Sequence, residues 1–397
     1  MDRKRRDFLS ATAAAATLGA AAPLLPQMMP SAMLPPPGQM VSSAAAYNAP
    51  TEIKKIEVMN LRELEALAQK VIPAGGFGYI SSGAGDEWTK RENEAAFKRI
   101  TIIPHYLSGY GDADLSTTLL GAKISMPVIT TVMGGHGMAH ATAEGGTAKG
   151  TDASGTLFTA PSQSNLSMED IAKASPGPKW FQIYLPSDRG KATELLQRAK
   201  AAGYRAIVLT IDAFIPSNRE TDRRNKFRFE VPRGNFFEKN GEYKTYPQKA
   251  NLGWDDVAFV QQVSGLPVIL KGVLSPELAL MAVDRGCGAI QVSNHGGRQL
   301  DDMPASITML PRIADAVAGR IPIVMDGGVR RGQDVFKALA LGANAVAIGR
   351  PVMYGLALGG WMGVQAVLDR LKEEFEMTMR LAGARSLGEI SKRALNV

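Results

Sequence analysis

From residue 126 onward, the chain alternates short apolar runs with longer amphipathic segments. Eight runs of four to six residues have the length and composition of buried parallel strands. Segments such as 191–202 and 333–341 lie between the runs and repeat Leu and Ala at helical spacing. The eight runs are Pro127–Val132, Thr156–Thr159, Trp180–Leu185, Ala206–Ile211, Pro267–Lys271, Ala289–Ser293, Pro322–Met325 and Ala345–Ile348.

Eight repeats of strand and helix are what a closed parallel barrel requires. The alternative is an open doubly wound sheet, which typically carries a G-x-G-x-x-G turn after its first strand, and none follows here. Residues 60–98 precede the barrel and are expected to be helices packed against it. We therefore expect an α/β fold, a (β/α)8 TIM barrel with N-terminal helices.

A polar stretch, Glu220–Asp256, separates the fourth run from the fifth. It is too long for an ordinary barrel loop, because most connections in compact domains are a few residues long. We expect it to be a lid over the active-site face. A surface insertion without a role is the alternative.

The first 46 residues differ in composition from the rest of the chain. Residues 3–6 are basic, residues 11–22 form an alanine-rich apolar run, and residues 44–46 are three alanines. These are the three parts of an export signal, and Arg5-Arg6 ahead of Phe8-Leu9 resembles the twin-arginine type. A disordered basic tail is the alternative.

We accordingly expect residues 1–46 to be a twin-arginine-type signal peptide and spacer, and residues 47–397 to form the barrel domain. The mature protein would be periplasmic or otherwise exported. The apolar run is too short and too rich in alanine for a stable membrane span, which needs about 20 strongly apolar residues.

The amino-acid composition limits the kinds of site that the chain can form. The chain has 397 residues with 45% apolar and 21% charged residues, as in a globular protein. Its single cysteine, Cys287, excludes an intrachain disulfide and any site built from several thiolates, and four histidines leave little for a metal centre. The net charge of +7 is spread along the chain, and an anionic small molecule accounts for it as well as nucleic acid does. We expect neither a metal nor a nucleic-acid partner.

Polar side chains end six of the predicted strands. Barrel enzymes carry their chemistry at this end, because the loops after the strands converge there. Each residue alone could be a satisfied core or rim residue, but the whole set indicates an active site. The residues, in strand order, are Gln182 and Tyr184; Thr210 and Asp212; Lys271; Ser293, Asn294 and His295; Asp326; and Arg350.

The last two strands end in glycine and arginine. Asp326-Gly327-Gly328-Val329-Arg330 follows the seventh run, and Gly349-Arg350 follows the eighth. Such glycines expose backbone N–H groups and the arginines add forked donors, which predicts a phosphate site. A phosphorylated substrate and the phosphate of a flavin mononucleotide would produce the same pattern.

After the sixth run, His295 stands three residues before Arg298. A base next to a forked carboxylate ligand suits the oxidation of an α-hydroxy acid. The segment Ser293–Leu300 resembles the S-N-H-G-x-R-Q-L signature of the FMN-dependent L-2-hydroxy acid oxidases and dehydrogenases. Other matching segments occur in the same order along the chain: Gly75–Ile80, Gly85–Thr89, Phe181–Tyr184, Leu209–Asp212, Asn218-Arg219, Asn225–Phe227, Lys271-Gly272 and Asp326–Gly332.

The resemblance covers roughly Tyr47 to the C-terminus and is greatest to the lactate oxidase and lactate monooxygenase branch. It implies an FMN-dependent enzyme that oxidises a short L-2-hydroxy acid, L-lactate first among them, to the 2-keto acid by hydride transfer to flavin N5. The reduced flavin would be reoxidised by oxygen or another acceptor. It also implies a homo-oligomer, a tetramer in this family.

The resemblance also implies roles for individual residues. His295 would be the base, paired with Asp212, and Lys271 would lie near the flavin N1–C2 edge. Four residues would bind the substrate: Tyr79, Tyr184, Arg219 and Arg298. The cofactor would be bound by Val132, Met133 and Gly134 beside N5, by Gln182, Thr210 and Ser293 at the polar ring edge, and by Asp326, Gly327, Gly328, Val329, Arg330, Gly349 and Arg350 around the phosphate.

Three positions depart from the family pattern. Pro161 replaces a usual serine, Gln163 replaces an aromatic residue of the substrate side-chain pocket, and Gly134 resembles the monooxygenases where oxidases commonly have alanine.

Two other functions stay open: a barrel isomerase or aldolase acting on a phosphorylated substrate, and a flavin-binding protein without catalysis. His136 and His140 lack the glutamate of H-E-x-x-H and are expected to pack at a helix start rather than bind metal.

Overall fold

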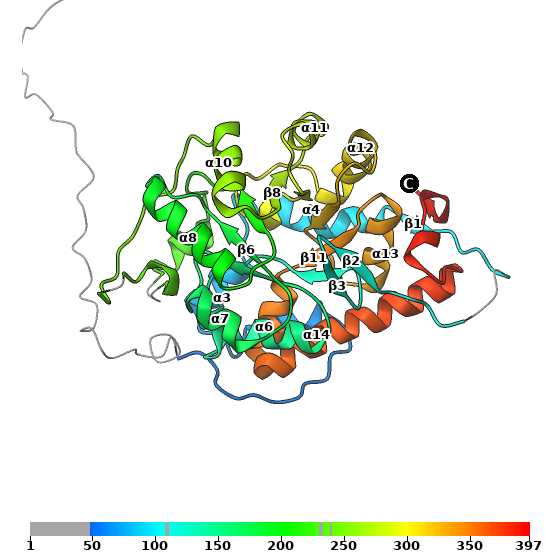
Figure 1. Ribbon diagram of the computed structural model, residues 1–397. Helices are drawn as coiled ribbons and strands as arrows, with labels where there is room; N and C mark the ends of the chain where they lie inside the picture. The colour runs from blue at the N-terminus through cyan, green and yellow to red at the C-terminus, as the bar shows by residue number, and fades with distance from the viewer. Residues whose placement is uncertain (1–47, 108–110, 230–232, 239) are drawn as a thin grey trace, which may run out of the picture. The chain divides into compact units, whose positions relative to one another are not determined.

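The computed structural model describes residues 48–107, 111–229, 233–238 and 240–397, so the expected export signal lies outside the described residues. Eight parallel strands close into a barrel, in the order β4 to β11 (Figure 1). Each predicted run overlaps one of these strands, and pairing of Val346 with Val128 joins the last strand to the first. The predicted TIM barrel is confirmed. The strands are β4 (Val128–Thr130), β5 (Phe158–Pro161), β6 (Lys179–Ile183), β7 (Ile207–Thr210), β8 (Val268–Val273), β9 (Ala289–Val292), β10 (Ile323–Asp326) and β11 (Ala345–Ile348).

Successive strand residues face opposite sides of the barrel wall. Trp180 packs with the barrel interior, whereas its neighbour Phe181 packs with the layer of surrounding helices. This alternation is the period of two that a strand imposes on its side chains. The hairpin of β2 (Thr117–Leu119) and β3 (Ala122–Ile124) adds Leu119 and Ile124 to the interior cluster just ahead of the first barrel strand. It therefore fills the end of the barrel opposite the expected active site.

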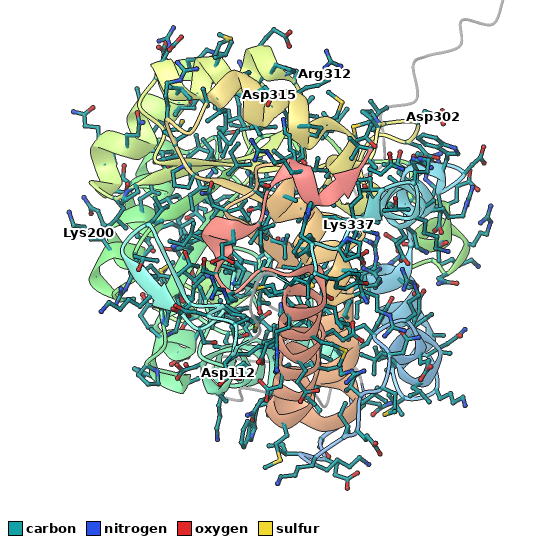
Figure 2. The ribbon with its side chains drawn as sticks, turned by 90° about the vertical axis from the view of Figure 1, so that its right-hand side faces the viewer. Asp112, Lys200, Asp302, Arg312, Asp315 and Lys337 are labelled. Atoms are coloured by element: carbon teal, nitrogen blue, oxygen red, sulfur yellow. The ribbon has the colours of Figure 1, made fainter. Side chains whose placement is uncertain are left out.

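Helices follow the strands and cover the barrel. Ser167, Asp188 and Ser275 cap three of them by accepting a hydrogen bond from a backbone N–H of the first turn. Figure 2 shows Lys200 and Arg312 on the outer faces of their helices, as expected of amphipathic helices. The helices are α6 (Ala143–Ala153), α7 (Met168–Ala174), α8 (Arg189–Ala201), α10 (Trp254–Ser264), α11 (Pro276–Asp284), α12 (Ser306–Val317), α13 (Gly332–Ala340) and α14 (Arg350–Ala382).

Helix α14 bends at Gly359 and Gly360, where the backbone leaves helical geometry. Among the described residues it is the one helix long and apolar enough to cross a membrane, but 72% of its most apolar window is buried inside the protein. A core helix of a globular domain has this property. The remaining short elements are α5 (His136–Ala139), η3 (Leu387–Glu389), η4 (Lys392–Ala394) and the pair β1 (Thr101–Ile102) with β12 (Leu395–Asn396).

The expected N-terminal helices are present as α2 (Glu63–Ala68), α3 (Ala74–Ser81) and α4 (Trp88–Lys98). Helix α4 lies against the loop after β9. The carboxamides of Asn93 and Asn294 exchange two hydrogen bonds of 2.8 Å, and the backbone N–H of Thr89 donates to Asp301 at 2.8 Å. The N-terminal helices therefore brace the loop that carries His295.

The segment between β7 and α10 contains α9 (Glu220–Arg224) and η1 (Gly234–Phe236). The predicted C-terminal boundary of the insertion, Asp256, was wrong because α10 begins at Trp254. Asp256 belongs to the first turn of that helix, where its carboxylate accepts the N–H of Gly253 at 2.8 Å. The insertion reaches the expected active-site face, and its movement as a lid stays a prediction.

Candidate active site

A cavity of about 570 Å³ lies at the carboxyl ends of the barrel strands. Most of the predicted site residues line it together, although they come from segments far apart in the sequence. Thr210, Asp212 and Ser293 are not among the lining residues and contact the site through other side chains. The predicted residues that line the cavity are Tyr79, Val132, Met133, Gly134, Gln182, Tyr184, Arg219, Lys271, His295, Arg298, Asp326, Gly327, Gly328, Val329, Arg330, Gly349 and Arg350.

His295 is held in an unusual backbone conformation. Its φ is 57°, in the left-handed region that few non-glycine residues adopt, and Gly296 and Gly297 also have positive φ. The side chain of Asn294 accepts the N–H of Gly297, and the N–H of His295 donates to Ser293 Oγ at 3.0 Å. The tight loop therefore fixes the direction of the imidazole.

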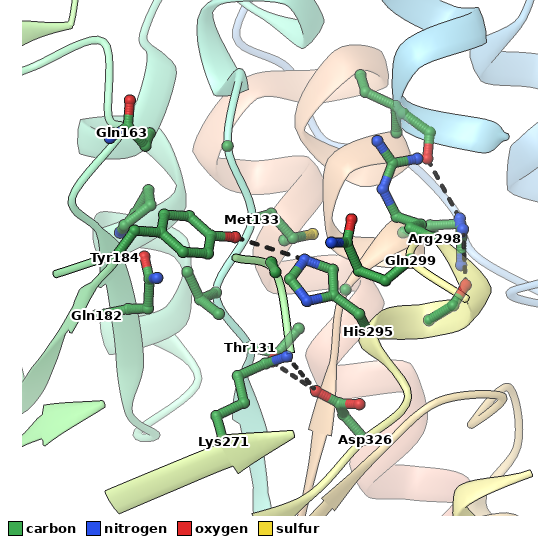
Figure 3. A pocket seen from close by; sticks show the side chains of 18 of the residues that line it. Thr131, Met133, Gln163, Gln182, Tyr184, Lys271, His295, Arg298, Gln299 and Asp326 are labelled. Atoms are coloured by element: carbon green, nitrogen blue, oxygen red, sulfur yellow. Dashed lines mark hydrogen bonds and ion pairs between the residues drawn. The ribbon is translucent and has the colours of Figure 1, made fainter. Parts of the chain in front are cut away.

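The imidazole of His295 connects a carboxylate with the cavity. Its Nδ1 lies 2.9 Å from Asp212 Oδ1, and its Nε2 lies 3.4 Å from the Tyr184 hydroxyl (Figure 3). Burial lowers the pKa of His295 below its ordinary value of 6.5, although the Asp212 carboxylate opposes that shift. The ring is therefore neutral near pH 7, and Nε2 is available to accept a proton.

Asp212 stays ionised behind the imidazole. Burial by itself raises the pKa of this carboxyl, but His295 and Lys271 outweigh it and hold the pKa below the ordinary value. Its Oδ2 is buried without a hydrogen-bond partner among the described residues. A carboxylate in this place orients the imidazole and stabilises the cation that forms when the ring takes up a proton.

Two guanidinium groups lie over the ring of Tyr79. The distance from the ring centroid is 4.9 Å for Arg298 and 5.8 Å for Arg219. Burial, followed by the repulsion of Arg219, lowers the pKa of Arg298 to about 10. The two guanidinium groups are partly buried, and Asp222, 3.9 Å from Arg219, is the one carboxylate paired with them among the described residues, so a bound anion would stabilise the pair further. Forked guanidinium donors match a carboxylate.

A hydrogen-bonded network lies deeper in the cavity. The Lys271 ammonium is 3.6 Å from Asp326 Oδ2 (Figure 3). It also donates to Ser293 Oγ at 3.0 Å, and Asp326 Oδ2 accepts from Gln291 at 2.6 Å. Gln291 was missed in the sequence because it lies inside a strand, although a glutamine within an apolar run is a detectable signal. Asp326 Oδ1 is buried and, among the described residues, has no partner.

The loops after β10 and β11 shape the predicted phosphate site. Gly327 and Gly328 have φ of 100° and 82°, and a Cβ at Gly328 would lie 1.9 Å from the carbonyl oxygen of Asn93. Arg350 donates to three backbone carbonyls, those of Ile80, Ser82 and Gly296, at 2.9–3.2 Å. These neutral acceptors orient the guanidinium and leave its charge for an anion.

These features fit FMN. Arg350 and the glycine loops offer donors for a phosphate, the unpartnered Asp326 Oδ1 can accept from a ribityl hydroxyl, and Lys271 supplies a fixed cation beside the cavity. The amide of Gln182, predicted to bind the ring edge, is 3.3 Å from Ser162 N and 2.9 Å from Thr210 Oγ1. Its role, like those of Thr210 and Ser293 behind the wall, stays a prediction.

His136 and His140 contact protein atoms. His136 Nδ1 lies 2.7 Å from Thr147 Oγ1, and His140 Nδ1 lies 2.9 Å from Thr142 Oγ1. Within the described residues, no group of three or more His, Cys, Asp or Glu side chains is placed to hold a metal ion. The two histidines pack around a helix start.

Comparisons of the sequence and of the structure with known proteins point to the same family. Residues 68–397 match the family model of the FMN-dependent dehydrogenases. The chain is 44% identical to an L-lactate oxidase of Lentilactobacillus hilgardii, over 86% of this chain and 95% of that protein. It is 43% identical to glycolate oxidase 3 of Arabidopsis thaliana, with 85% and 95% covered.

A solved structure of a mandelate oxidase variant with (S)-mandelic acid superposes with a TM-score of 0.80 at 37% identity, covering 85% of this chain and 98% of that one. The matches in sequence and structure each cover at least 85% of this chain. The chain therefore belongs to the family of FMN-dependent dehydrogenases that contains the 2-hydroxy acid oxidases.

Proposed function

We propose that this protein oxidises a short L-2-hydroxy acid to the 2-keto acid, with L-lactate as the first candidate substrate. One observation carries the proposal: a neutral imidazole backed by a carboxylate faces the same cavity as two adjacent guanidinium groups. Relatives are named as oxidases of lactate, glycolate and mandelate, which share a reaction type but differ in the size of the substrate side chain. The comparisons therefore constrain the side chain of the substrate less than the reaction.

The substrate carboxylate would bind between Arg219 and Arg298. The Tyr79 ring packs against both guanidinium groups and fixes their spacing. With the carboxylate held there, the C2 hydroxyl would lie within reach of His295 Nε2 and the Tyr184 hydroxyl, which are 3.4 Å apart. Fixing these two groups and directing the C2–H bond toward the flavin would set three directions at C2, which would distinguish the L from the D isomer.

His295 Nε2 would remove the hydroxyl proton while C2 is oxidised. The resulting imidazolium is stabilised by Asp212, whose carboxylate is 2.9 Å from Nδ1. Burial raises the pKa of the Tyr184 phenol, so this hydroxyl stays protonated and can donate to the developing keto oxygen.

The chemistry that FMN would supply when bound is that of a hydride acceptor for C2. Arg350 and the loops of Gly327, Gly328 and Gly349 would hold its phosphate. Lys271 would stabilise negative charge on the reduced ring, and Asp326 keeps that ammonium in place at 3.6 Å. The electron acceptor that completes the cycle is proposed to be oxygen, with another acceptor as the alternative.

The test is an anaerobic panel of L-2-hydroxy acids added to the purified, FMN-loaded protein. We expect loss of the flavin absorbance near 450 nm with L-lactate or a close analogue and no change with the D isomer. Admission of oxygen followed by assay of keto acid, peroxide and decarboxylated product then distinguishes an oxidase, a dehydrogenase and a monooxygenase. Failure of every L acid to bleach the flavin would contradict the proposed function.

Export is a separate proposal and is supported by the sequence of residues 1–46 alone. Because the twin-arginine route carries folded proteins, it suits a protein that binds its cofactor before export. Cell fractionation tests it: replacing Arg5 and Arg6 by lysine should retain the protein in the cytoplasm. Unchanged export of that variant would contradict a twin-arginine signal.

A further inference from the structure

The cavity carries more positive charge than the proposed reaction uses. Six cationic side chains line it, whereas Asp326 is the one carboxylate among the lining residues that the structure describes. A cavity with this balance attracts anions. The six cations are Arg219, Arg233, Lys271, Arg298, Arg330 and Arg350.

Five of these cations already have a partner or a proposed ligand. Arg330 is 2.9 Å from Glu94, Lys271 is 3.6 Å from Asp326, and Arg350 lies at the phosphate loops. Arg219 and Arg298 form the proposed carboxylate site. Arg233 is the cation that the FMN phosphate and the reacting carboxylate do not account for.

Arg233 lacks an anionic partner among the described residues. None of their ion pairs includes it, and its buried Nε has no hydrogen-bond acceptor. Its guanidinium lies 5.2 Å from the ring centroid of Phe229, an apolar surface that cannot accept its N–H groups in their plane. A buried donor without a partner is costly unless a ligand supplies the acceptor.

Arg233 packs on a different ring from the two arginines of the carboxylate site. Its ring, Phe229, packs edge-on against Tyr79 with centroids 5.7 Å apart, and Tyr79 in turn packs beneath Arg298. The guanidinium groups of Arg233 and Arg298 thus belong to one aromatic cluster. The proposed position of lactate, with its carboxylate at Arg219 and Arg298, leaves Arg233 without a role.

Gln163 adds a second unpaired polar group near Arg233, because the N–H of Gly234, next to Arg233, donates to the carbonyl oxygen of Ser164, next to Gln163, at 2.9 Å. Its Oε1 is buried without a hydrogen-bond partner among the described residues. A Cβ added to Gly134 would be 4.0 Å from the Gln163 backbone oxygen and 3.7 Å from the Tyr79 hydroxyl, so these three residues are close neighbours. The carboxamide can present its NH2 group or its oxygen to a ligand.

We propose that Arg233 and Gln163 form a second anion subsite, which binds a carboxylate at the end of the substrate side chain. Among L-2-hydroxy acids longer than lactate, the enzyme then selects dicarboxylates over monocarboxylates of the same length. An apolar side chain could pack on Phe229 but would leave the Arg233 Nε unpaired. This inference rests on the proposed function, because it assumes that the first carboxylate binds at Arg219 and Arg298.

Two pairs of substrates matched in chain length test the subsite: L-malate against L-2-hydroxybutyrate, and L-2-hydroxyglutarate against L-2-hydroxyvalerate. We expect the second-order rate constant of anaerobic flavin reduction to favour the dicarboxylate by about tenfold or more in at least one pair, the size of a charge-assisted hydrogen bond. A monocarboxylate that is equal or better in both pairs would overturn the proposal.

Variants assign the preference to Arg233. Arg233→Met should reduce the dicarboxylate preference about tenfold, and Arg233→Lys should retain part of it. The matched control is Arg224→Met, which removes a positive charge from the same insertion at a side chain that is 71% exposed and outside the cavity lining. It should leave the preference unchanged. An unchanged preference in Arg233→Met, with flavin still bound, would overturn the proposal.

Binding of the keto products separates this proposal from the proposed function. Titration of the oxidised holoprotein with 2-ketoglutarate and 2-ketovalerate, followed by the flavin difference spectrum, measures affinity without turnover. Tighter binding of 2-ketoglutarate that is lost in Arg233→Met supports the subsite even if no hydroxy acid is oxidised. Equal binding of the two keto acids to the unaltered protein counts against the subsite whatever the enzyme oxidises.

Discussion

The inner and the outer walls of the cavity are built differently. The inner wall includes Lys271 and Asp326, with Gln291 and Ser293 packed behind it; Lys271 donates to Ser293, Gln291 donates to Asp326, and all four residues are at most 5% exposed. The outer wall comes from loops, where Phe214 and Ile215 are 47% and 60% exposed and polar atoms of Gln163 and Arg233 lack partners among the described residues.

This contrast separates two functions of the site. Strand pairing and hydrogen bonds hold the side chains of the inner wall in nearly fixed positions, and the proposed hydride and proton transfer requires such fixed positions. Loops tolerate substitution, so the outer wall can change its ligand without disturbing the chemistry. Substitutions should therefore affect the chemical step at the inner wall and substrate choice at the outer wall.

The largest effect is expected at His295. His295→Ala removes the proton acceptor and should slow substrate-driven flavin reduction by about a thousandfold, within the range for general bases. FMN should remain bound, because the proposed phosphate site is formed by other residues. Stopped-flow absorbance measures both quantities, and reduction at the original rate would exclude His295 as the base.

A smaller effect is expected from Arg298→Lys. An ammonium cannot form the forked contact that a guanidinium offers a carboxylate, so substrate binding should weaken by about 10- to 100-fold. The dependence of the reduction rate on substrate concentration gives the affinity, with the maximal rate less affected. Equal affinity in the variant would remove Arg298 from the carboxylate site.

The pH dependence should report the imidazole of His295. Because burial lowers its pKa, the neutral form persists below pH 6.5, and kcat/KM should reach its plateau at a lower pH than an ordinary histidine allows. Asp212 raises the pKa of His295, so Asp212→Asn should move the acidic limb to still lower pH while reducing the plateau. A limb displaced to higher pH in Asp212→Asn would contradict this coupling.

The smallest effect is expected from Gln163→Leu at the outer wall. The substitution removes a neutral polar group, so we expect a change of a few-fold in the relative kcat/KM of L-2-hydroxyvalerate and L-2-hydroxyglutarate. The rate with L-lactate serves as the internal reference. A loss as large as that of His295→Ala would show that the inner and outer walls are not functionally separate.

Regular elements were the most predictable part of the molecule. The eight strands could be predicted because a buried strand is a local property of the sequence, a short apolar run. The position of His295 and Lys271 at the cavity could then be predicted, because the carboxyl ends of barrel strands lie at one face. The end of the insertion was misplaced although its signal is local, because Asp256 caps the first turn of α10 by accepting the N–H of Gly253. The pairing of Asn93 with Asn294 could not be predicted, because it spans 201 positions.

That pairing has a consequence for how the catalytic loop is completed. Asn93 precedes all eight barrel strands, and Asn294 follows the sixth, so the two amides meet only after most of the chain has been synthesised. Closing so large a segment is slow compared with forming local helices. We therefore expect the loop of His295 to reach its final geometry late in folding, and removal of the α4 segment should leave that loop without the amide of Asn93 that holds Asn294.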